Sequence, residues 1–244
     1  MRKHAGISLS EVLIGLFLSS LLMTMLMQFY SQSKQGYIEM ERMLATNFDL
    51  RWVSDLLSDS IRRAGFTPCL GIDQLNLKKQ GMLVHGLHIE NGPRYLLQIN
   101  RMHEQFAEVI NIPNTRQILV PQASSFNKKR PLIIADCEQA EIQRSFSMRT
   151  HAKGVLITLD KPLQFKYTGV VYVGEYWEER WFIKKNAQGK PALFYQLGQP
   201  EEVTSLIQSL HSYRQHQNGA VLMQVALGLA EGGTQNIMVT VRGS

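Results

Sequence analysis

The sequence contains only two cysteines and eight prolines in 244 residues, and no proline occurs before Pro68. It also lacks any charged residue from Val12 to Met27. The missing prolines permit one uninterrupted helix through the first quarter of the chain. Cys69 and Cys137 form no CxxC pair, which excludes a paired-cysteine zinc motif. The net charge of +6 includes Arg2 and Lys3, and is too small to indicate a nucleic-acid partner.

Motifs for catalysis are missing as well. The chain has no Walker loop, no GxSxG motif and no HExxH motif, and it has no internal repeat. His85 and His88 would lie on opposite faces of a strand, which argues against shared metal binding. We therefore expect no enzyme, no cofactor and no metal site.

One group of carboxylates could suggest a glycosidase pair. Glu175, Glu178 and Glu179 flank Trp177 and Trp181. Carboxylates that alternate with aromatic residues are more typical of a half-buried sheet face, which is the interpretation we adopt. The short basic groups 78–79, 128–130 and 184–185 are interpreted as solvated turns, so nucleic acid is not an expected partner.

The N-terminal apolar run is long enough to cross a membrane. A helix from Ile7 to Phe29 would span about 34 Å, against a hydrocarbon core of roughly 30 Å. Arg2 and Lys3 precede it, which predicts a cytoplasmic N-terminus with the rest of the chain on the other side. Glu11 lies inside this run, where a charge costs roughly 2.5–3.5 kcal/mol on insertion scales. Such a carboxylate needs a partner.

Three interpretations of this N-terminus differ in how they treat Glu11. A secretory signal peptide needs a small-residue cleavage site after the apolar core, and none is present. A plain single-pass anchor leaves Glu11 unexplained. Cleavage after Gly6 would make Ile7 the new N-terminus, with Glu11 one helical turn further on. The Glu11 carboxylate of one subunit could then meet the N-terminal amine of its neighbour in a packed array of helices.

The stretch AG-ISLSEVLIGL resembles the processing site of type IV prepilins, which carry a class III signal peptide. The resemblance implies that Gly6 precedes the scissile bond and that Ile7 becomes a methylated N-terminus. It also implies that Glu11 is the carboxylate that forms the assembly salt bridge. Ile7 stands where the family most often has phenylalanine.

Helical periodicity continues beyond the apolar run. Apolar residues recur at steps of three or four in a stripe of Tyr37, Met40, Leu44, Phe48, Trp52 and Leu56, which Val53, Leu57 and Ile61 widen. Arg62-Arg63, Gly65 as a left-handed cap and Pro68 mark the end of the helix. We predict one helix over 7–64, with a membrane or assembly half at 7–30 and an amphipathic half at 31–65 that covers a head.

Residues 66–244 carry short alternating runs that predict an antiparallel, strand-rich head after the cleaved leader 1–6 and the helix. The expected strands are 82–90, 95–102, 109–112, 117–120, 132–137, 155–159, 170–176, 179–184, 193–197, 221–227 and 236–242. Residues 186–190 predict a hairpin loop, and 202–210 fit a helix or a strand. The fold class is α+β and pilin-like, with a long helix packed on an antiparallel sheet.

Cys69 and Cys137 fall on the far side of the membrane, where thiols oxidise. A bridge between them would close a loop of about 68 residues and stabilise the head by roughly 4 kcal/mol. The alternative is two unrelated thiols.

IRRAGFTPCLG and the later IIADCEQAEIQRSF are similar to segments of PilW-like minor pilins of the type IV pilus. Two groups of residues carry the match: Arg62, Ala64, Gly65, Phe66 and Cys69, then Asp136, Cys137, Ala140 and Glu141. The C-terminal run GAVLMQVALGLAEGG…NIMVTVRG also resembles that family's final strands. The J-type pseudopilin of type II secretion shares the broad architecture.

The resemblance implies a minor pilin of a Gram-negative bacterium that primes pilus assembly and stays at or near the tip. The implied partners are the prepilin peptidase, other minor pilins, the major pilin, the inner-membrane assembly platform and membrane lipid. The protein would wait in the inner membrane with its head in the periplasm before it enters the pilus. The alternative from another class is a membrane-anchored periplasmic enzyme or sensor.

Overall fold

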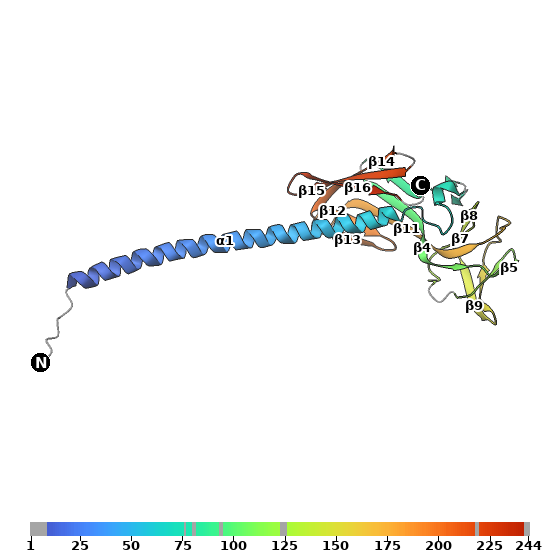
Figure 1. Ribbon diagram of the computed structural model, residues 1–244, viewed down its shortest axis with the longest axis horizontal. Coiled ribbons are helices and arrows are strands. Elements are labelled where there is room, and N and C mark those ends of the chain that lie inside the picture. The colour runs from blue at the N-terminus through green and yellow to red at the C-terminus, as the bar shows by residue number, and fades with distance from the viewer. Residues whose placement is uncertain are drawn as a thin grey trace. The chain divides into compact units, whose positions relative to one another are not determined.

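A computed structural model describes residues 9–75, 77–79, 82–92, 95–122, 126–217 and 220–241. A single long helix, α1 (Leu9–Arg62), is followed by a short 3-10 helix, η1 (Ile72–Gln74), and then by antiparallel strands (Figure 1). The architecture is therefore α+β, as predicted, and is consistent with a pilin-like fold. The chain divides into two compact units, and the boundary falls after Arg51, inside α1. We call the described residues from Trp52 onward the head unit.

The predicted helix over 7–64 is confirmed from Leu9 to Arg62, while Ile7 lies outside the described residues. Gly65 has a φ of +72°, the left-handed conformation expected after the helix end. Its N–H donates to the carbonyl of Asn100 (2.9 Å), and the N–H of Met102 donates to the carbonyl of Phe66 (2.8 Å). The helix end is thus tied directly to the neighbouring strand.

The largest sheet is built around β11 (Tyr172–Lys185), which pairs with three other strands. Five strands run in the order β13-β12-β11-β4-β3, β7 adds to β11, and β8 adds to β7. The bounds are β3 (Leu87–Glu90), β4 (Leu96–Glu108), β7 (Leu132–Ala135), β8 (Ala140–Gln143), β12 (Pro191–Gln196) and β13 (Pro200–Thr204).

Three smaller sheets complete the head unit. A four-stranded sheet has the order β5-β6-β10-β9, a three-stranded sheet has the order β14-β15-β16, and β1 pairs with β2. The bounds are β1 (Lys78–Lys79), β2 (Met82–Leu83), β5 (Asn111–Asn114), β6 (Gln117–Val120), β9 (Phe146–His151), β10 (Gly154–Leu159), β14 (Ile207–Gln217), β15 (Ala220–Leu229) and β16 (Thr234–Thr240).

The strand predictions hold best where alternation is strong. Residues 117–120 are β6 as predicted, and 186–190 join β11 to β12 as the predicted hairpin loop. The two strands predicted at 170–176 and 179–184 are one strand, β11, because a register shift at Gly174/Tyr176 absorbs the break in alternation. The run 82–90 is split into β2 and β3, and 202–210 falls across β13 and β14. No strand was expected at β1, β8 or β9, and the basic groups 78–79 and 184–185, interpreted as turns, lie in β1 and at the end of β11.

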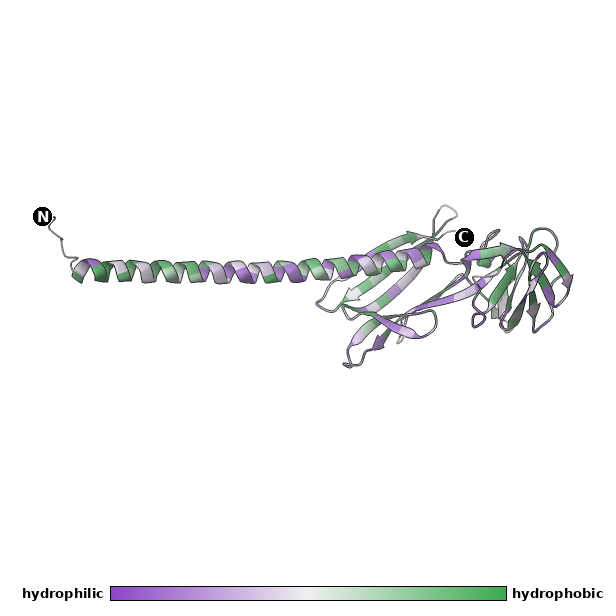
Figure 2. Ribbon diagram, turned by 90° about the horizontal axis from the view of Figure 1, so that it is seen from below, coloured by the Kyte–Doolittle hydropathy of each residue, from purple (hydrophilic) through white to green (hydrophobic). Residues whose placement is uncertain are grey.

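The buried face of α1 is only a part of the predicted stripe. Tyr37 and Phe48 are exposed, at 69% and 72%, whereas Val53, Leu57 and Ile61 are completely buried. All side chains from residue 9 to 45 are exposed. The last turns of α1 pack on the sheets of the head unit through the i, i+4 row of Val53, Leu57 and Ile61, and the buried Ser60 also faces the strands. Figure 2 shows apolar residues around the first part of α1 and mixed polar and apolar residues further along.

Two further clusters of buried side chains belong to the core. One lies between the four-stranded sheet and β7, and it includes Ile118, Leu132, Ile157 and Val173. The other gathers η1 and the loop after it against β4, β7 and β11. Together they hold the loop that carries Cys69 close to the turn that carries Cys137.

Candidate functional site

Glu11 lies in the first turn of α1 and is exposed. The next charged residue along the chain is Lys34, so a single carboxylate stands at the start of the apolar run. A negative charge in the first turn interacts favourably with the helix dipole. Gly6 and Ile7, the residues predicted to flank the cleaved bond, lie outside the described residues.

The apolar part of α1 is long and apolar enough to span a membrane as a single pass. Its hydroxyl groups are compatible with lipid because they donate to the helix backbone. Ser19 donates to Leu16 (2.9 Å), and Thr24 donates to Leu21 (2.8 Å). Such bonds leave no hydroxyl proton unsatisfied in a hydrocarbon environment.

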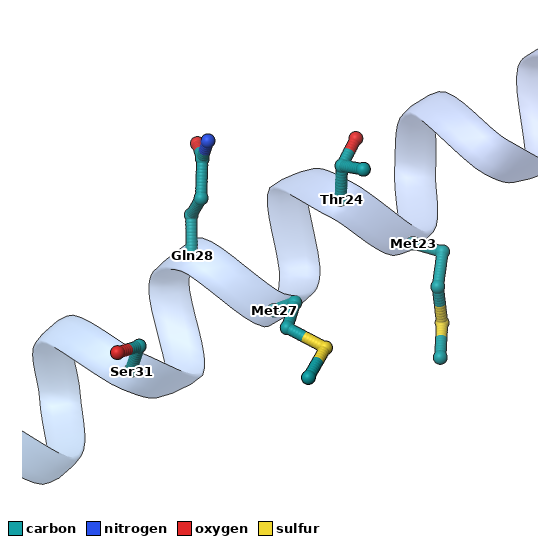
Figure 3. Close-up of a pocket in the computed structure, with 5 residues that line it drawn as sticks. All are labelled: Met23, Thr24, Met27, Gln28 and Ser31. Carbon is teal, nitrogen blue, oxygen red and sulfur yellow. The ribbon is translucent and has the colours of Figure 1, made fainter.

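A shallow groove follows this part of the helix. Thr24 and Gln28 extend from one side, and Met23 and Met27 extend from the opposite side (Figure 3). All of its lining residues belong to one helix, so it is an open surface rather than a ligand cavity. It presents polar groups and flexible thioethers on the surface of the helix.

The predicted disulfide between Cys69 and Cys137 is confirmed, with a Cα–Cα distance of 5.2 Å. Asp136, which precedes Cys137, shapes the turn between β7 and β8. Its Oδ1 accepts the N–H groups of Glu138 and Gln139, both at 2.8 Å. This side chain fixes the tight turn and thereby positions Cys137, which accounts for the aspartate of the Asp-Cys element.

Glu141 follows on β8 and is buried, at 4% exposure. It accepts the hydroxyl of Tyr167 (3.1 Å) and the N–H of Gln164 (3.0 Å). Burial raises the pKa of its carboxyl, and the hydrogen bonds oppose that rise. The glutamate is therefore an internal anchor for the loop 164–167.

The most elaborate polar cluster lies between α1 and the large sheet. Arg101 and Glu179 are each only 1% exposed, and Arg101 Nε donates to Glu179 Oε1 at 2.6 Å. Ser60 of α1 donates to the other oxygen of Glu179 (2.8 Å), and Tyr195 also hydrogen-bonds to this carboxylate. Burial, followed by the negative charge of Glu179, raises the pKa of Tyr195. The buried carboxylate is fully engaged by donors from α1, β4 and β12.

Trp177 is placed directly opposite Arg101 in the β11–β4 register. The guanidinium carbons of Arg101 and Arg130 lie 4.6 and 4.8 Å from its ring centroid. His103 stacks on the same ring at 4.3 Å, and burial is the main reason that its pKa is lowered. These contacts are cation–π and aromatic interactions around one indole.

The three carboxylates that could suggest a glycosidase pair, Glu175, Glu178 and Glu179, each form an ion pair with an arginine. Glu175 pairs with Arg130 (3.2 Å) and accepts the indole N–H of Trp177 (3.0 Å), while Glu179 pairs with Arg101. Trp177, Glu179 and Trp181 alternate along β11, so the half-buried sheet face predicted from this pattern is confirmed. Through Ser60, Glu179 also joins α1 to the large sheet.

His85 lies before β3, and its Nδ1 is 3.1 Å from Asp73 Oδ1. His88 is on β3 and exposed. Among the described residues, no group of three His, Cys, Asp or Glu side chains could hold a metal ion.

Sequence reasoning missed Arg101 and Ser60. Arg101 gave no signal because it is one of several polar residues in β4 and pairs with a residue 78 positions away. A scan against protein-family models, a search of the curated proteins and a search of the solved structures each find no match to this chain.

Proposed function

We propose that this chain is a PilW-like minor pilin that takes part in type IV pilus assembly. In this mechanism the peptidase cuts after Gly6, and the new amine of Ile7 is methylated. Glu11 of one subunit then pairs with the amine of a neighbour, which sets the axial register between helices. Minor and major pilins assemble through α1 on the inner-membrane platform, and this subunit primes the filament and stays near its tip.

The observation that supports this proposal is the form of α1. It is one helix from Leu9 to Arg62, and every side chain from residue 9 to 45 is exposed. An apolar surface of that length is unfavourable in water and has to be covered by lipid or by protein. The exposed apolar residues continue past the membrane-length run to Tyr37, Met40 and Leu44, which favours neighbouring helices as the cover.

Glu11 supports assembly over simple anchoring. A carboxylate within the bilayer costs roughly 2.5–3.5 kcal/mol on insertion scales, and an anchor gains nothing from it. An opposite charge from a neighbouring N-terminus removes most of that cost and rewards one alignment of the two helices. Register selection of this kind is the best-attested use of a charged group in an apolar helix interface.

The head is built to stay attached to the helix. Ser60 bonds to the Glu179 carboxylate, and the disulfide joins the segment after the helix to the β7–β8 turn. These connections would let a force along α1 reach the sheet without detaching the last helical turns.

Two measurements test the proposal. N-terminal sequencing of the protein from cells that contain prepilin peptidase should begin at Ile7, and from cells without the enzyme it should begin at Met1. Cross-linking in membranes should then recover other pilins. A mature chain that keeps Met1, or one that begins beyond Gln28, would exclude the mechanism. Recovery of type II secretion components instead of pilus components would assign the chain to the J-type pseudopilins.

A further inference from the structure

A cavity of about 360 Å³ lies between the last turns of α1, with Arg63 directly after them, and the strands β4, β11, β12 and β13 of the head unit. Its walls include all three tryptophans of the chain, Trp52, Trp177 and Trp181, together with Tyr195. The volume is within the range of small-ligand sites, which are typically about 300–1,000 Å³. The polypeptide has thus concentrated its largest aromatic side chains at one place.

The charges around the cavity do not balance. Asp59 pairs with Arg63, and Glu179 pairs with Arg101. Glu201 and Glu202 of β13 also line the cavity, and both are exposed. Within the described ranges neither of them forms an ion pair with a basic side chain, and Glu202 accepts only the neutral amide of Asn186 (3.1 Å). The mouth of the cavity is therefore negative.

The aromatic walls of the cavity also favour a positively charged ligand. A positive group over an indole or phenol ring is attracted by the ring quadrupole. Trp177 already binds two guanidinium groups in this way, whereas Trp52 is 50% exposed. Trp181 is 2% exposed, and its indole nitrogen has no hydrogen-bond partner in the described part of the chain. This nitrogen is enclosed by protein, so the rings open to a ligand are the exposed Trp52 and the partly buried Tyr195.

We propose that this cavity binds an arginine or lysine side chain from a basic segment of a partner protein. The cation would stack on Trp52 and Tyr195 and pair with Glu201 and Glu202. A neutral saccharide could also stack on these rings, but it would leave the two carboxylate charges uncompensated. The site is separate from Glu11, and this inference does not depend on the proposed function.

The tryptophans make the test direct, because all intrinsic tryptophan fluorescence comes from the walls of this cavity. The full chain is purified in a non-ionic polyoxyethylene detergent, which carries no sugar. It is titrated with the peptide acetyl-Gly-Arg-Arg-Gly-amide and with the same peptide containing citrulline, which is nearly isosteric and uncharged. We expect a saturable change with the arginine peptide, and binding weaker by on the order of tenfold with citrulline.

Variants locate the binding. Glu201→Gln with Glu202→Gln, and separately Trp52→Leu, should each weaken binding by on the order of tenfold. These positions are exposed, so the fold should be retained. Glu138→Gln with Glu231→Gln removes the same charge from exposed positions elsewhere and should leave binding unchanged.

Three outcomes would overturn the proposal. The citrulline peptide could bind as tightly as the arginine peptide, or the control variant could weaken binding as much as the cavity variant does. A neutral oligosaccharide could also produce the saturable fluorescence change when the arginine peptide does not. The last outcome would assign the cavity to a saccharide.

Discussion

Arg101 and Glu179 form an ion pair at 2.6 Å, and their side chains are only 1% and 2% exposed to water. They lie diagonally across β4 and β11, under the last turns of α1. Two charges in such an environment are tolerated because each neutralises the other and because Ser60 and Tyr195 satisfy the remaining carboxylate positions. The pair thereby specifies how the helix sits on the sheet of the head unit.

Removing one member of this pair should destabilise the head strongly. Arg101→Met leaves the Glu179 carboxylate buried without its cation, and we expect a loss of about 3–5 kcal/mol. The double variant Arg101→Met with Glu179→Leu should lose less than the single variant, because no charge remains buried. Chemical unfolding of the full chain in detergent, followed by tryptophan fluorescence, measures both. A single variant as stable as the wild type would contradict this account.

Gly86 should not accept a side chain. A Cβ at this position would lie 2.7 Å from the Cα of Gly65 and 2.9 Å from its nitrogen, and both are backbone atoms. Gly86→Ala should therefore destabilise the head by about 1–3 kcal/mol through overpacking at the helix end. Gly92→Ala is the matched control, since a Cβ there meets nothing within 4 Å. Equal unfolding midpoints for the two variants would show that the contact is not tight.

Glu141 should make the head less stable as the pH rises. Burial raises the pKa of its carboxyl above the unfolded value near 4.5. The folded state thus binds the proton of Glu141 more tightly than the unfolded state does. The resulting stabilisation of the fold is complete below the unfolded pKa and is lost as the pH rises through the folded pKa. Glu141→Gln keeps the shape of the neutral acid. Its stability relative to the wild type should increase from acid to neutral pH, and a constant difference would refute the assignment.

Glu104 should produce the opposite trend. Burial alone would raise the pKa of this carboxyl, but its backbone hydrogen bond and the charges of Arg101 and Arg63 outweigh burial, so the pKa is lowered. The stabilisation from Glu104 is present above the unfolded pKa and is lost as the pH falls through the folded one. In Glu104→Gln this acid-side loss should be smaller than in the wild type. The unfolding temperature of both proteins is measured as the pH falls, and an equal decrease in the two would contradict this role of Glu104.

Glu11→Ala should be inserted and cleaved normally but should fail to support piliation, because the neighbour's amine loses its counter-charge. Glu11→Gln should fail in the same way, since it is nearly isosteric but neutral. Glu39→Ala removes an exposed carboxylate later in the same helix and should leave pili intact. The measurement is the number of pili per cell at equal protein levels. Normal piliation with Glu11→Ala would favour a plain membrane anchor.

The helix and the disulfide were predictable because their signals are local. An apolar run followed by helical periodicity, with no proline over 54 residues, predicts a helix, and Gly65 marks its end through a backbone conformation that other residues rarely adopt. Two cysteines allow only one intramolecular pairing. The strands were less predictable: β11 continues through a bulge at Gly174, and β8 has the sequence AEIQ, in which Ile142 is the one residue that favours strands.

The sequence by itself determined a membrane-length helix with one early carboxylate, a strand-rich head and a single possible disulfide, because these depend on composition and on neighbours along the chain. Tertiary structure alone decided which part of the predicted apolar stripe of α1 is buried, since contact with strands far away in sequence covers Val53, Leu57 and Ile61 and leaves Tyr37 and Phe48 exposed. It also decided that Arg101 meets Glu179 and that three tryptophans enclose one cavity. Long-range pairing depends on strand register, which the local pattern of residues does not encode.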